Sequence, residues 1–67
     1  MITIEEVKRQ IEVIKEKGVH DDEIAHAYED ELHVAVLEAI SSGSPDAVEL
    51  AKLVLTTQSL DFHRWCA

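Results

Sequence analysis

Two interruptions of helical periodicity constrain this chain more than any other feature. The first is Gly18, and the second is the run at residues 41–45, which reads Ser-Ser-Gly-Ser-Pro. Glycine tolerates left-handed backbone and proline lacks an N–H donor, so both residue types commonly end helices. On either side of these breaks, apolar residues recur at helical steps of three and four. The pattern therefore predicts three short helices in 67 residues, which is the length of a single domain, residues 1–67.

The first helix is predicted from about Ile4 to Lys17, with Gly18 as its stop. Thr3 and Glu6 have the spacing of a capping box, in which each side chain accepts from the other residue's backbone. The apolar residues of this segment form one narrow stripe, similar to the seam of a coiled coil: Ile4, Val7, Ile11 and Ile14.

The second helix is predicted from about Asp22 to Ser41, because carboxylates at its start favour the positive end of the helix dipole. At about 100° per residue, one face gathers apolar side chains: Ile24, Tyr28, Leu32, Ala35, Val36 and Ala39. The opposite face gathers His26, Asp30, His33 and Leu37, with Glu29 beside them. We expect the first face to be buried and the second to be exposed, with Gly43 as the C-terminal stop.

The third helix is predicted to begin with Ser44 as its cap and Pro45 as its first residue. Residues 47–55 carry an apolar arc wider than one neighbouring helix needs, which indicates two neighbours or a second chain. We therefore expect a homodimer. A last helical turn is predicted after Asp61. The expected fold is all-α, a small antiparallel three-helix bundle with a short C-terminal helical turn.

The charge of the chain is strongly negative and unevenly placed. The net charge is −8, and residues 18–51 contain nine acidic residues and neither lysine nor arginine. Such a segment repels phosphates, so we expect no nucleic-acid binding and instead a protein partner with a basic surface. No apolar run approaches the ~18 residues of a membrane span, and the first residues lack a signal peptide's pattern. With a single cysteine, these features predict a cytoplasmic protein without membrane contact.

Histidines and carboxylates are densest between residues 20 and 33. His26 with Asp30, and Glu29 with His33, are spaced four residues apart, which allows two ligands to share a metal ion. A zinc site needs three or four ligands, so we expect no metal and no cofactor, and a metal-binding protein remains the alternative. The sequence contains no nucleophile–base pattern and no phosphate-binding glycine loop, so we expect no catalytic residues and no enzyme.

The C-terminal residues concentrate two of the three aromatic side chains, Phe62 and Trp65. With Arg64, they have the composition of a protein-binding hot spot. We also predict that both aromatics close the core of the domain, since a ring of this size buries ~150–250 Å². The two predictions are compatible if the core continues into a dimer.

Two segments carry a resemblance: Ala25-His26-x-x-Glu29-Asp30, and residues 61–67, which read Asp-Phe-x-Arg-Trp-Cys-Ala in this pattern. Together with Gly43 between them, they make residues 20–67 similar to a family of short proteins encoded by bacteriophages and prophages. The resemblance implies a bacterial host cell and no particular activity.

The function predicted is a non-enzymatic protein–protein interaction module, a phage accessory or regulatory protein acting on a host protein. A metal-binding structural or regulatory protein and a nucleic-acid mimic are the alternatives. The binding residues predicted for the protein partner are Asp22, His26, Glu29, Asp30, His33, Arg64 and Trp65.

Overall fold

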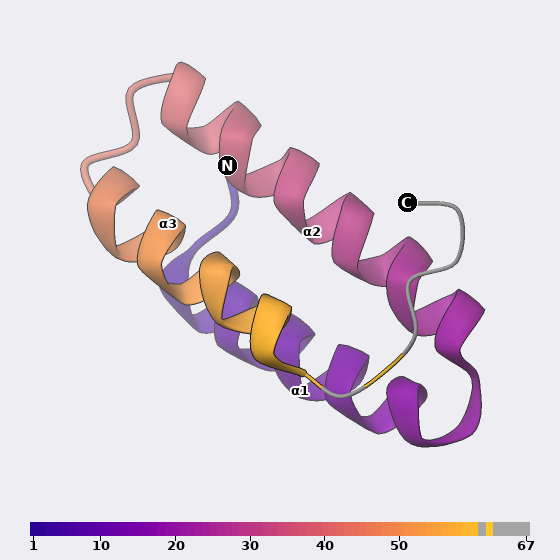
Figure 1. Cartoon of the computed structure of the whole chain (residues 1–67). Coiled ribbons are helices and arrows are strands. Elements are labelled where there is room, and N and C mark those ends of the chain that lie inside the picture. The colour runs from indigo at the N-terminus through magenta and orange to yellow at the C-terminus, as the bar shows by residue number, and fades with distance from the viewer. Residues whose placement is uncertain (61, 63–67) are drawn as a thin grey trace.

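The computed structural model describes residues 1–60 and residue 62. Its elements are α1 (Ile4–His20), α2 (Asp22–Ser41), α3 (Ala47–Leu55) and a 3₁₀ turn, η1 (Thr56–Ser59). Successive helices run in opposite directions and α1 contacts both others, and the described residues contain no strand (Figure 1). The predicted all-α three-helix bundle is therefore confirmed. The turn expected after Asp61 lies outside the described residues, and η1 was not predicted.

The start of α1 is the predicted capping box. The Glu6 backbone N–H donates to Thr3 Oγ1 at 3.2 Å, and the Thr3 N–H donates to Glu6 Oε1 at 3.3 Å. Two backbone donors that a helix would otherwise leave unpaired are satisfied in this way.

Gly18 does not end α1, which continues to His20. The reversal occurs at Asp21, whose extended backbone separates the two helices. The Asp21 carboxylate accepts the backbone N–H groups of Glu23 and Ile24, at 3.0 and 3.2 Å, and so caps α2. The predicted stop was wrong because an aspartate able to cap the next helix is sufficient to turn the chain.

The predicted stop of α2 at Gly43 is confirmed. Gly43 has φ of +87°, its N–H donates to the Ile40 carbonyl, and the Ser44 N–H donates to the Ala39 carbonyl. This pair of bonds is a Schellman motif, which needs a left-handed residue at this position. The predicted start of α3 at Pro45 was early, because Ser44 Oγ accepts the Asp46 N–H in a separate turn before the helix begins at Ala47.

The core lies between the three helices and is built mainly of aliphatic side chains. Val7 and Ile14 of the predicted α1 stripe are fully buried, and Ile4 and Ile11 pack against the core. The other buried apolar residues are Ala25, Leu32, Val36, Ala39, Leu50, Val54 and Phe62. The prediction that Phe62 helps to close the core is confirmed, whereas Trp65 lies outside the described residues.

The buried face of α2 differs from the prediction in its first half. Ile24 and Tyr28 are 41% and 38% exposed, whereas Ala25 and Glu29 are buried. A prediction that chooses the buried face by hydrophobicity alone leaves glutamate outside. A glutamate can nevertheless be buried where its carboxylate oxygens are hydrogen-bonded. No described helix has the length and apolar character needed to cross a membrane.

Candidate functional site

An apolar hollow of about 230 Å³ lies between α2 and α3, and we call it the α2–α3 groove. It is lined by His33, Val36, Leu37, Ile40, Ala51, Val54, Leu55 and Gln58. Leu37 and Leu55 belong to opposite helices and remain 64% and 58% exposed. The groove therefore presents aliphatic side chains to solvent from both of its sides.

The spacing of residues on each helix explains the groove. On α2, His33, Leu37 and Ile40 follow one another at steps of four and three, so they share one stripe. On α3, Ala51 and Leu55 are four residues apart and face this stripe. Because Ala51 carries only a methyl group, it leaves space that a larger residue would fill.

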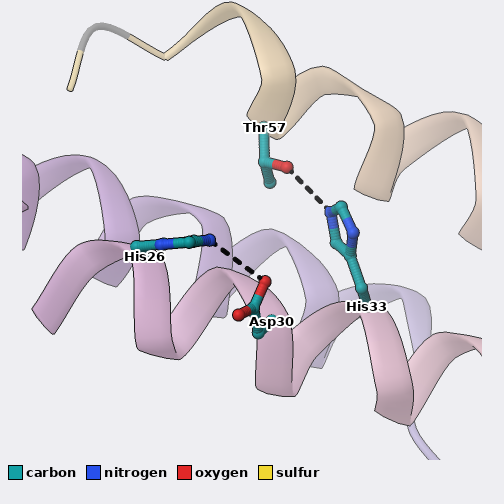
Figure 2. A network of polar contacts seen from close by, with 4 residues as sticks. All are labelled: His26, Asp30, His33 and Thr57. Carbon is teal, nitrogen blue, oxygen red and sulfur yellow. Dashed lines mark hydrogen bonds and ion pairs between the residues drawn. The ribbon is translucent and has the colours of Figure 1, made fainter. Parts of the chain in front are cut away.

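One end of the groove is fixed by a bond between α2 and η1. His33 Nε2 lies 3.0 Å from Thr57 Oγ1. Figure 2 marks this contact by a dashed line. Thr57 is fully buried, and its hydroxyl donates to the Val54 carbonyl at 2.9 Å. Since a carbonyl only accepts and a hydroxyl has one proton, His33 Nε2 must be the donor to Thr57. This bond orients the imidazole along the edge of the groove.

Beyond this end of the groove, His26 and Asp30 lie on the same helix and contact each other. His26 Nε2 is 3.5 Å from Asp30 Oδ1, and the two side chains are 18% and 69% exposed (Figure 2). Asp22 is half-buried at the start of α2. The structure therefore brings His26 close to Asp30, as their spacing predicts.

Glu29 is not part of this exposed surface. Its residue is only 4% exposed, so the prediction that it belongs to a solvent-facing acidic face was wrong. No buried side-chain nitrogen or oxygen in the described residues lacks a hydrogen-bond partner, which is the condition for burying polar groups in a small core. His33, four residues after Glu29, is hydrogen-bonded to Thr57.

A structural or catalytic metal site in a protein needs three or four ligands. Among residues 1–60 and 62, no group of three or more histidine, cysteine, aspartate or glutamate side chains is placed to hold one ion. Arg64 and Trp65, also predicted to bind a partner, lie outside the described residues.

Of the residues that line the groove, His33 was predicted as a site residue, and the others were not: Val36, Leu37, Ile40, Ala51, Val54, Leu55 and Gln58. The sequence feature that could have indicated the groove is Leu37, because it is an apolar residue on a helix stripe otherwise occupied by His26, Asp30 and His33. Comparison of the chain with protein-family models, curated proteins and solved structures finds no match.

Proposed function

We propose that this protein is a non-enzymatic interaction module that binds a protein partner through the α2–α3 groove and the adjoining exposed part of α2. The observation that carries the proposal is the exposure of Leu37 and Leu55 on the two sides of one apolar groove. Aliphatic side chains clustered around a concave surface indicate a site for another molecule more strongly than scattered exposed residues do.

The charge of the chain supports a basic partner. The net charge is −8, and Asp30 is 69% exposed near the groove. Complementary charge accelerates association and selects among partners more than it raises affinity. The phage-family resemblance of residues 20–67 implies a bacterial host cell and no activity, and we therefore propose that the partner is a protein of that host and that the role is accessory or regulatory.

The experiment is affinity capture from a bacterial lysate with three immobilised forms of the protein: wild type, Leu37→Glu and Val34→Glu. Val34 is 55% exposed on the same helix but does not line the groove, so it is a matched control. We expect wild type and Val34→Glu to retain the same basic protein, and Leu37→Glu to lose it. Absence of any protein retained by wild type above a blank resin would contradict the proposal.

A further inference from the structure

We propose that the α2–α3 groove binds one amphipathic helix of the partner, with apolar residues along one stripe and lysine or arginine at the end beside Asp30. This inference rests on the proposed function and specifies the partner's chemistry. Helix-in-groove recognition uses apolar anchors at positions i, i+3 or i+4, and i+7.

The dimensions of the groove match such anchors. On α2 it extends from His33 to Ile40, seven steps that span about 10 Å at ~1.5 Å per residue. Two turns of a partner helix cover the same distance and present three side chains to the groove. Leu37 and Leu55 would flank these anchors from opposite sides.

An exposed carboxylate, that of Asp30, lies beyond one end of the groove. Asp30 lies seven residues before Leu37 on α2, so it shares the stripe of Leu37 and extends it beyond His33. Basic residues of the partner are therefore favoured beside Asp30.

A second copy of the chain is a poorer occupant than a basic helix. It would bring a further net charge of −8 to the surface, and a large net charge keeps proteins apart. Four of the chain's six lysines and arginines lie in α1, and the apolar stripe of α1 is already occupied, since Val7 and Ile14 are fully buried in the core. The complementary helix therefore comes from a different protein.

The test uses labelled helical peptides of about 18 residues, long enough to populate a helix. All carry leucines at positions i, i+4 and i+7, and they differ in having three lysines at the N-terminal turn, three lysines at the C-terminal turn, or glutamates in their place. Fluorescence anisotropy measures binding to wild type, Leu37→Glu, Val34→Glu and Asp30→Lys. Circular dichroism confirms that each variant is folded.

We expect one lysine peptide to bind wild type at least about tenfold more tightly than its glutamate counterpart, a difference of about 1.4 kcal/mol. Leu37→Glu should weaken this binding by a similar factor, Val34→Glu should leave it within about twofold, and Asp30→Lys should reverse the preference for lysine. Equal binding of all peptides, or equal loss in Leu37→Glu and Val34→Glu, would overturn the inference.

Sedimentation of the protein without peptide tests whether a second copy of the chain occupies the groove. A wild-type dimer that Leu37→Glu dissociates would show that a second copy occupies the groove, and would overturn the inference of a basic helix. In the affinity capture, a host protein retained equally by wild type and Leu37→Glu would agree with a protein-binding function. It would show that the binding surface lies outside the α2–α3 groove.

Discussion

The Phe62 ring packs directly on Gly18 near the end of α1. A Cβ atom at Gly18 would lie 3.2 Å from Phe62 Cδ2 and 3.4 Å from Phe62 Cβ. Phe62 is only 9% exposed, so the ring and the helix backbone form part of one core. Glycine at position 18 therefore allows the Phe62 ring to pack closely against the backbone of α1. The helix continues through this position to His20.

Replacing Gly18 by a branched residue should displace Phe62. We expect Gly18→Val to destabilise the protein by about 1–3 kcal/mol, because overpacking forces the ring out of its position. The measurement is thermal unfolding in trimethylamine N-oxide, an osmolyte that keeps weak variants folded. In a Phe62→Ala background the cost of Gly18→Val should fall by at least about 1 kcal/mol, whereas additive effects would show that the two residues do not touch.

Glu29 and Asp30 are adjacent acidic residues with opposite surroundings, which allows a direct comparison. Glu29 is 4% exposed, whereas the Asp30 side chain is 69% exposed. We expect Glu29→Ala to cost about 2–4 kcal/mol, because it empties a buried position and removes bonded polar atoms. Asp30→Ala should change the free energy of unfolding by less than about 0.5 kcal/mol, as surface substitutions usually do.

Chemical denaturation of the two variants checks this expectation. Similar midpoints for Glu29→Ala and Asp30→Ala would mean that Glu29 lies at the surface after all. In that event it would rejoin the residues available to a partner.

Substitution of Gly43 tests the effect of backbone conformation on stability, because an added Cβ atom there would have open space around it. Its φ is +87°, and an added Cβ would meet no atom within 4 Å. Gly43→Ala should therefore destabilise the protein by about 1–2 kcal/mol through left-handed strain alone. Ser42→Ala at the preceding exposed position is the control, and urea titration should show a change below about 0.5 kcal/mol for it. A neutral Gly43→Ala variant would contradict the Schellman ending of α2.

The local signals in the sequence predicted most of the fold. The Thr3–Glu6 capping box and the stop at Gly43 depend on residues close together in the chain, and both are present. The role of Gly18 depends on Phe62, more than forty positions away, and no local pattern contains that contact. A glycine after an apolar stripe fits a helix stop and a packing site equally well.

The candidate site was only partly predictable for a related reason. Helical spacing places His26 near Asp30, and the two side chains are in contact. The groove depends on how α2 and α3 pack, and on the small Ala51 opposite the stripe of Leu37. Periodicity describes one helix at a time, so it indicates that Leu37 is exposed without identifying what lies across from it.

The bond from His33 to Thr57 should fix the proton on one nitrogen of the imidazole. Because the Thr57 hydroxyl donates to the Val54 carbonyl, neutral His33 must carry its proton on Nε2. Nitrogen-15 spectra of the neutral ring should show this tautomer, and Thr57→Val should abolish the preference. A proton found on Nδ1 in the wild type would contradict the bond.

The same bond should contribute to stability across the groove. Thr57→Val keeps the volume of the side chain but removes the acceptor of His33 and the donor to Val54, and should cost about 1–2 kcal/mol. Thr56→Val is the matched control, since Thr56 is exposed and its hydroxyl donates to the nearby Leu53 carbonyl. In a double-mutant cycle, His33→Ala should couple to Thr57→Val by about 1 kcal/mol and not to Thr56→Val. Equal coupling to both threonines would mean that η1 is not fixed to α2 through His33. The position of His33 at the edge of the groove would then not depend on Thr57.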